Sequence, residues 1–224
     1  VELQLLWTLP IAVRAPLTAP RLDQMRSRRR AGPLPGNARR LTCNPGRGSG
    51  HGGPSIMVTM LRQRLELIEE RIGRALSRAG RKRPEITLVA ITKVFPAETV
   101  REAYGLGLRD FGENYVQEFQ SKAPRLADLP GARFHFVGRL QSNKARRAAE
   151  LFQVIETIDS GKIARKISEA GRSVEAMIEV KLSPEQAKSG VDPEHLAALI
   201  EAVRALPNLD LTGLMTMPPW SEDA

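Results

Sequence analysis

Six short apolar runs alternate with helix-like segments along this chain, and this alternation limits the folds open to it. Most of the runs begin roughly 20–25 residues apart, which is the length of one strand plus one helix. Connections of that length are too long for hairpins, so the strands are expected to lie parallel in one sheet. The predicted strands lie near residues 86–92, 108–112, 133–137, 153–158, 174–181 and 209–216, and the predicted helices near 97–105, 114–127, 142–151, 161–171 and 193–206.

An amphipathic helix is predicted ahead of the first strand. Its apolar residues recur at spacings of three and four, which places them on one helix face: Leu61, Leu65, Ile68, Ile72 and Leu76. Gly80 is a favourable residue for ending this helix, and Pro84 prevents its continuation. Asp192 and Pro193 are typical of the first residues of a helix, so the last helix is expected to begin there.

Residues 1–56 differ from the rest of the chain in composition. They contain nine arginines, no lysine, two acidic residues, seven prolines and seven glycines. Such a segment cannot bury enough apolar surface to offset its chain entropy, so a disordered leader is predicted over 1–56 and a folded domain over 57–224. A transit peptide or a basic arm for nucleic acid are alternatives. We favour translated upstream sequence that precedes a start at Met57 or Met60.

The positive charge of the chain is concentrated in this leader. The formal net charge is +9 for 224 residues, and residues 57–224 carry only +2 of it. The folded part is therefore near neutral, and its charge does not indicate nucleic-acid binding. The single cysteine, Cys43, leaves no partner for an intramolecular disulfide and fits a reducing compartment. No apolar run approaches the roughly 18 residues that span a bilayer, and no metal site is expected.

One lysine stands where a parallel sheet would bind a ligand. The apolar, β-branched run Leu88–Thr92 ends on Lys93, and Pro96 then opens the next helical segment. The carboxyl end of a buried parallel strand is where α/β proteins bind ligands. An amine that is desolvated there loses its proton more readily and condenses with an aldehyde. The alternative is a strand-end lysine that extends into solvent.

The fold class is α/β, and two parallel architectures remain open. The chain has no dinucleotide-binding glycine fingerprint, which leaves a doubly wound sheet or a (β/α)8 TIM barrel. A barrel needs two more strand–helix units than the sequence contains. If the chain is a barrel, it is truncated after about six strands, with exposed edges on its first and last strands.

Five sequence blocks resemble the YggS/PROSC family, the pyridoxal phosphate homeostasis proteins. They follow the family order: Leu88–Lys93; Phe111–Glu118; His135–Gly138 with Leu140–Lys144; Glu185 with Lys188–Gly190; and Gly213–Met215. The resemblance implies a (β/α)8 barrel of the alanine racemase N-terminal type. It further implies pyridoxal 5′-phosphate (PLP) held as a Schiff base on Lys93, and a role in intracellular PLP (vitamin B6) homeostasis without conventional catalysis.

The resemblance also implies cofactor contacts from three strand ends. Asn114 is expected to bond the ring hydroxyl of PLP, with an Asx turn or a helix cap as the alternative, in which Glu113 and Asn114 are both capping residues. His135 faces away from Phe134 and Phe136, and is either a cofactor neighbour or a core histidine with satisfied hydrogen bonds. Met215 is expected beneath the cofactor, with simple core packing as the alternative.

Glu185 and Lys188 complete the implied site, in the loop after the fifth strand, where the lysine takes the aldehyde in transit. The alternative is a pair of solvated loop charges. Phe95 departs from the family pattern, because many relatives carry a second lysine there. The family's serine-rich loop and its last glycine-rich block, which supply phosphate donors and an arginine facing the pyridine nitrogen, are not found after Pro219.

The expected partners are PLP and PLP-dependent apoenzymes, with no nucleic acid and no membrane, and a monomer in the cytoplasm is expected. The alternative function is a PLP-dependent amino-acid racemase-like enzyme. That enzyme would need a second domain with a catalytic tyrosine, and Tyr104 and Tyr115 are the only tyrosines. A third interpretation is a nucleic-acid module driven by the leader, which predicts salt-sensitive binding that is lost without residues 1–56.

Overall fold

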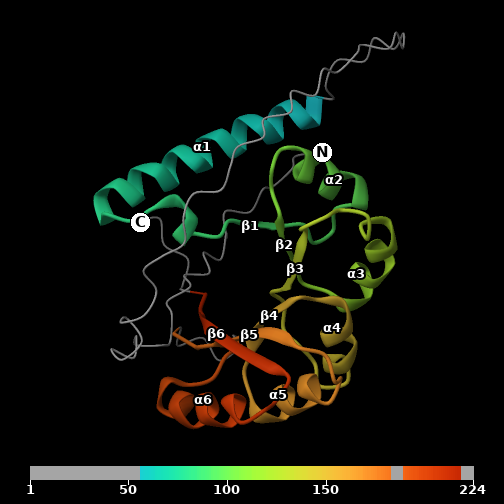
Figure 1. The fold of residues 1–224 in the computed structure, drawn as a ribbon, viewed down its shortest axis with the longest axis vertical. Coiled ribbons are helices and arrows are strands. Elements are labelled where there is room, and N and C mark those ends of the chain that lie inside the picture. The colour runs from blue at the N-terminus through green and yellow to red at the C-terminus, as the bar shows by residue number, and fades with distance from the viewer. Residues whose placement is uncertain (1–55, 183–188, 218–224) are drawn as a thin grey trace, which may run out of the picture.

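The computed structural model describes residues 56–182 and 189–217, which form an α/β unit around one parallel sheet (Figure 1). The strands lie across the sheet in chain order: β1 (Val89–Ile91), β2 (Asp110–Glu113), β3 (Arg133–Phe136), β4 (Val154–Ile158), β5 (Val174–Glu179) and β6 (Leu209–Met215). The helices are α1 (Ile56–Ala79), α2 (Ala97–Gly105), α3 (Val116–Lys122), α4 (Ala145–Leu151), α5 (Gly161–Ser168) and α6 (Leu196–Arg204). The leader predicted over residues 1–56 lies outside the described residues, except for Ile56.

The predicted order of strands and helices is confirmed, and the differences are at the ends of strands and helices: β1, for example, covers only Val89–Ile91 of the predicted 86–92. α1 ends at Ala79, and Gly80 follows with a φ of 63°, which glycine adopts without strain. α4 begins three residues later than predicted, because a turn closed by the Lys144 N–H and the Gln141 carbonyl at 2.9 Å precedes it. α6 is preceded by a 3-10 turn with Pro193 at its start, and Asp192 makes no side-chain capping bond to it.

The second predicted helix is shorter than the apolar pattern suggests. The prediction covered residues 114–127, whereas α3 runs only from Val116 to Lys122. A 3-10 turn, Ala123–Arg125, then replaces the last α-helical turn. Pro124 explains this end, because proline lacks the N–H that an α-helix needs in its interior.

The helices α2 to α6 follow the convex side of the curved sheet, while α1 lies beyond β1 at one end (Figure 1). The main core fills the layer between these helices and the sheet. Phe119 of α3 is 1% exposed and packs between two other rings, with centroid distances of 4.6 Å to Phe134 and 4.7 Å to Phe152. Among the described strands, β1 and β6 are the two edges. No helix in the described ranges is both long enough and apolar enough to cross a bilayer.

We predict that Phe119→Ala lowers the free energy of unfolding by about 3–5 kcal/mol, because it leaves a cavity between two aromatic rings. Leu67→Ala is the control: Leu67 is 61% exposed, and the change should stay within about 0.5 kcal/mol. Urea unfolding monitored by circular dichroism measures both. Equal losses for the two variants would contradict the placement of the core.

Candidate functional site

The carboxyl ends of β1, β2 and β3 bring the predicted site residues to one edge of the sheet. Ile91 pairs with Gly112, which in turn pairs with His135. The ladder continues past the strands, because the Thr92 N–H donates to the Gly112 carbonyl at 2.8 Å. Lys93 and Asn114 therefore follow neighbouring strands at the same level. Both residues are partly buried.

Side chains alternate between the convex face, which meets the helices, and the concave face of the sheet. Phe111 belongs to the core beneath the helices, so its neighbour Gly112 lies on the concave face. A Cβ on Gly112 would stand 2.6 Å from Ile91, 3.2 Å from Val89 and 3.5 Å from Val137. A side chain at position 112 would therefore require Ile91 to move. Lys93 is in phase with Val89 and Ile91, so the strand directs it toward the concave face.

A tight turn carries Lys93. The Phe95 N–H donates to the Thr92 carbonyl at 3.2 Å, which closes a four-residue turn with Lys93 and Val94 in the middle. Val94 has a φ of 61°, and it is the only non-glycine residue with positive φ among the described residues. This conformation is unfavourable for a β-branched residue. Such strained backbone persists where surrounding contacts enforce it, and it is concentrated at functional sites.

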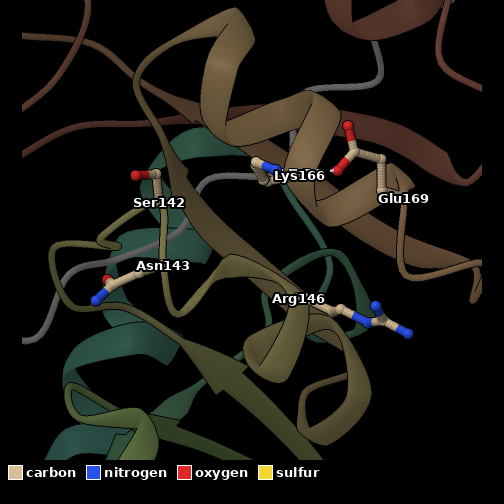
Figure 2. A pocket seen from close by; sticks show the side chains of 5 residues that line it. All are labelled: Ser142, Asn143, Arg146, Lys166 and Glu169. Atoms are coloured by element: carbon tan, nitrogen blue, oxygen red, sulfur yellow. Dashed lines mark hydrogen bonds and ion pairs between the residues drawn. The ribbon is translucent and has the colours of Figure 1, made fainter.

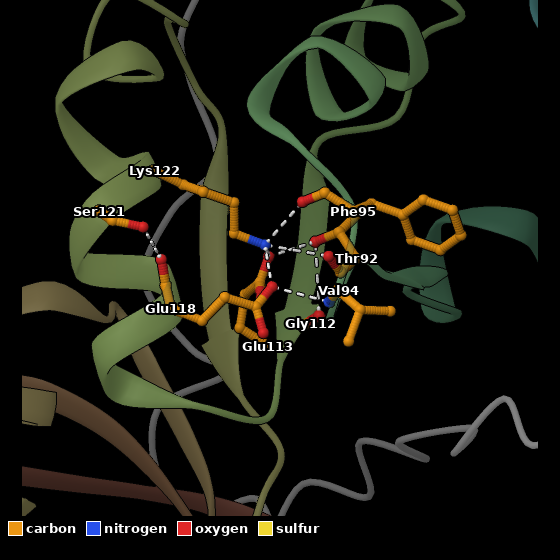
Figure 3. A network of polar contacts seen from close by, with 8 residues as sticks. All are labelled: Thr92, Val94, Phe95, Gly112, Glu113, Glu118, Ser121 and Lys122. Carbon is orange, nitrogen blue, oxygen red and sulfur yellow. Dashed lines mark hydrogen bonds and ion pairs between the residues drawn. The ribbon is translucent and has the colours of Figure 1, made fainter.

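The contacts that enforce this turn converge on Lys122 of α3 (Figure 3). Its ammonium donates to the carbonyls of Thr92 at 3.0 Å and Phe95 at 3.1 Å, which are the two ends of the turn. It also contacts one carboxylate oxygen of Glu113 at 2.7 Å and one of Glu118 at 2.8 Å. The Lys122 side chain is 8% exposed, so these contacts are shielded from water. Lys122, Glu113 and Glu118 together with the Thr92–Phe95 turn are called the Lys122 network below.

Glu113 faces the helices within this network and not the concave face. Its side chain is fully buried, and it accepts hydrogen bonds from Lys122 and from the Thr92 hydroxyl at 2.7 Å. Burial raises the pKa of this carboxyl above its ordinary value, and the bonds from Lys122 and Thr92 oppose that rise. Its second oxygen has no hydrogen-bond partner among the described residues. The sequence suggested a helix cap for Glu113, whereas the structure shows a buried acceptor.

His135 lies on the concave face, one layer below Lys93. Its Nδ1 is 2.7 Å from a carboxylate oxygen of Glu156, and its Nε2 is 2.9 Å from one of Asp110. Burial disfavours the charged ring, but the bonds to Asp110 and Glu156 outweigh it and raise the pKa of His135 above 6.5. The prediction that His135 faces away from Phe134 and Phe136 is confirmed, since both rings lie in the core beneath the helices.

The remaining predicted site residues lie in different parts of the fold. Asn114 packs closely against Gly138, since a Cβ at position 138 would stand 2.2 Å from the Asn114 carbonyl oxygen. Met215 ends β6 as predicted and is buried with Met177, apart from the main core. Glu185 and Lys188 lie outside the described residues. The loop that contains them is closed where it rejoins the fold, by a bridge between Val180 and Val191.

Glu179 is a buried carboxylate at the end of β5 that the sequence did not indicate. The Ser189 hydroxyl contacts both of its oxygens, at 2.9 and 3.0 Å. Burial raises the pKa of Glu179, with Asp159 adding to the rise, while Ser189 and Arg139 oppose it. This contact fixes one end of the loop after β5 at the same edge of the sheet as Lys93.

A hollow of about 430 Å³ lies on the outside of the fold, between α4 and α5 (Figure 2). Its lining consists of Ser142, Asn143, Arg146, Lys166 and Glu169. These side chains do not converge on one point in Figure 2, and none of them is a predicted site residue. The lining comes from the segment before α4, from α4 itself and from the C-terminal end of α5.

Comparison with known proteins agrees with this arrangement. The profile of the alanine racemase N-terminal domain matches residues 65–224. The chain is 45% identical over 172 residues to the pyridoxal phosphate homeostasis protein of Pseudomonas aeruginosa, covering 75% of this chain and 74% of that one. It is 41% identical over 165 residues to the protein of the same name from Escherichia coli K12, covering 70% of each.

Solved structures of similar proteins also match this chain. The structure of PipY from Synechococcus elongatus with PLP bound matches with a TM-score of 0.59 and 36% identity, covering 72% of each chain. The PipY structure without PLP matches with a TM-score of 0.58 and 40% identity, covering 66% of this chain and 71% of that one. The parallel α/β fold is thus of the alanine racemase N-terminal barrel type.

We predict that the free energy of unfolding falls as the pH rises from 6.5 through the higher pKa of folded His135. Below pH 6.5 the ring is protonated in both folded and unfolded chains, so its ion pairs contribute fully. Above the folded pKa that contribution is lost. His135→Gln should flatten this dependence. Urea unfolding at several pH values across this range measures the free energy of unfolding. If His135→Gln shows the same pH dependence as the wild type, a protonated His135 is contradicted.

Proposed function

The chain belongs to the family of pyridoxal phosphate homeostasis proteins, and we propose that it binds PLP covalently through Lys93. One observation carries the proposal. The Lys93 amine has no hydrogen bond or ion pair with any residue in the described ranges, although the residue is partly buried and its turn is fixed. Lys122, by contrast, has four acceptors around its ammonium. Only the first kind of amine is available to a ligand.

The side chains at this edge fit the chemistry of PLP. PLP supplies an aldehyde, which condenses with a primary amine, and the protein supplies binding and orientation. Lys93 supplies the amine. Asn114 follows the neighbouring strand and supplies an amide that donates to or accepts from a ring hydroxyl. The Asn114 backbone lies so close to Gly138 that a side chain at position 138 would clash with it.

The other predicted residues are proposed to lie around the cofactor. His135 lies beneath the site, where both of its ring nitrogens are engaged by carboxylates. Met215 and Met177 offer an apolar floor near the ends of β6 and β5. Glu185 and Lys188 are proposed as neighbours of the cofactor from the family resemblance alone.

We infer a carrier of PLP and not a racemase. A racemase needs acid–base groups that are free to exchange protons with its substrate, and the engaged nitrogens of His135 do not offer one. Tyr104 donates its hydroxyl to the Pro130 carbonyl at 2.8 Å, at the opposite edge of the sheet from Lys93. The proposal assigns the chain to cytoplasmic PLP homeostasis, as a monomer that delivers PLP to apoenzymes. We propose two domains for the chain: the leader, residues 1–56, and the barrel, residues 57–224.

We predict that Lys93→Ala abolishes the visible absorbance band that PLP gives when it is linked to a lysine. Lys144→Ala is the matched control, because Lys144 is also partly buried and lies in the segment between β3 and α4. It should keep the band. Titration of each purified full-length variant with PLP measures this. An equal band in both variants would contradict the assignment of Lys93.

A further inference from the structure

We propose that Lys122 is a positioning residue for Lys93: by bonding both ends of the Thr92–Phe95 turn, it holds Val94 at positive φ and directs the Lys93 amine to the concave face. The inference rests on the proposed function and extends it to a residue on another element. Lys122 itself does not touch the ligand, because it lies on the helix side of the sheet (Figure 3).

The first argument is the number of acceptors around one ammonium. A lysine has three N–H donors, whereas four oxygens lie within 3.1 Å of Lys122 Nζ. If Lys122 served only to pair with the Glu113 carboxylate, one of these contacts would be enough. The two backbone carbonyls show that the ammonium also clamps the turn, since Thr92 and Phe95 are its first and last residues.

The second argument is the source of the unusual conformation of Val94. Its side chain is 76% exposed, so packing of the isopropyl group does not enforce the positive φ. The Val94 N–H donates to a Glu118 oxygen at 2.7 Å, and the same oxygen contacts Lys122. The strained residue is thus held from both flanks and through its own amide by one network.

The third argument is the direction of the turn. Thr92 bonds to Glu113 on the helix side, through its hydroxyl. Lys93 comes one residue later, and extending the alternation of Val89 and Ile91 by one step assigns it to the opposite side. Lys122 of α3 fixes Thr92 and Phe95 from the helix side. The Lys93 side chain is therefore the part of the turn that faces the carboxyl edge of the sheet, where the ligand is proposed to bind.

The test separates positioning from fold stability. Lys122→Met alone leaves Glu113 buried without its cation, so we pair it with Glu113→Gln, because replacing both partners of a buried ion pair is often tolerated. Thermal unfolding checks that the double variant folds. Hydrogen exchange without PLP then follows the Val94 amide, whose protection should be lost in the double variant while the amides of β2 stay protected. Retained protection of the Val94 amide would overturn the inference.

Two ligands distinguish covalent capture from simple binding. PLP reports capture by Lys93, and 4-deoxypyridoxine 5′-phosphate, which lacks the aldehyde, reports non-covalent binding. The double variant should lose about 10- to 100-fold in apparent PLP affinity, the size expected from a misplaced reacting group, and should bind the deoxy analogue as the wild type does. Lys166→Met, which removes an exposed lysine paired with Glu169, should change neither. Parallel losses for both ligands would overturn the inference.

A third change, Val94→Gly, is added to the double variant to test whether Lys122 acts through the turn. Glycine adopts positive φ without strain, so the turn should then depend less on Lys122, and Val94→Gly should recover part of the PLP affinity of the double variant. Additive losses would contradict coupling through the turn. If the wild-type chain forms no adduct on Lys93, the proposed function fails together with this inference. If it does and the double variant matches it, only the inference fails.

Discussion

The contacts of one buried ammonium connect the three segments on which the proposed site depends. Lys122 bonds to the turn after β1, to Glu113 at the end of β2 and to Glu118 one helical turn earlier in α3. Removing one partner of a buried ion pair costs about 3–5 kcal/mol, because it leaves an uncompensated charge. The strained Val94 conformation and the position of Lys93 both depend on this interaction.

The sheet separates two kinds of polar chemistry. On the helix side, Glu113 is enclosed with Lys122 and stabilises the backbone that carries the site. On the concave side, Asp110, His135 and Glu156 form a second buried cluster, with His135 between two carboxylates. Both clusters satisfy most of their charged groups internally, so they orient the strand ends without competing for a ligand. Lys93 lies at the edge between them with its amine unengaged by the described residues.

The sequence predicted the order and approximate positions of the strands because most of them lie in short apolar stretches bounded by turn-forming residues, and the parallel connections followed from the spacing. It predicted the position of Lys93 because strand periodicity and parallel pairing place strand ends together. Helix ends were less accurate: the turn before α4 depends on local bonds that apolar periodicity does not encode, and the break at Pro124 follows from a proline that the periodicity alone does not take into account.

The Lys122 network was not predicted, for a physical reason. Its contacts join residues 4 to 30 positions apart, and only the Glu118–Lys122 pair is local. That i,i+4 pair by itself is typical of an exposed helix face. Glu113 suggested a helix cap because it precedes a helix. Its true partners come from β1 and α3, and only the folded chain brings them together.

The most direct test of the account is to locate the lysine that captures PLP. The full-length chain is incubated with PLP, reduced with borohydride, digested and mapped by mass spectrometry. The account predicts that the modification is concentrated on Lys93, because its amine is free and its turn is fixed toward the ligand edge. Modification concentrated on another lysine, or spread evenly over exposed lysines such as Lys162, would contradict it.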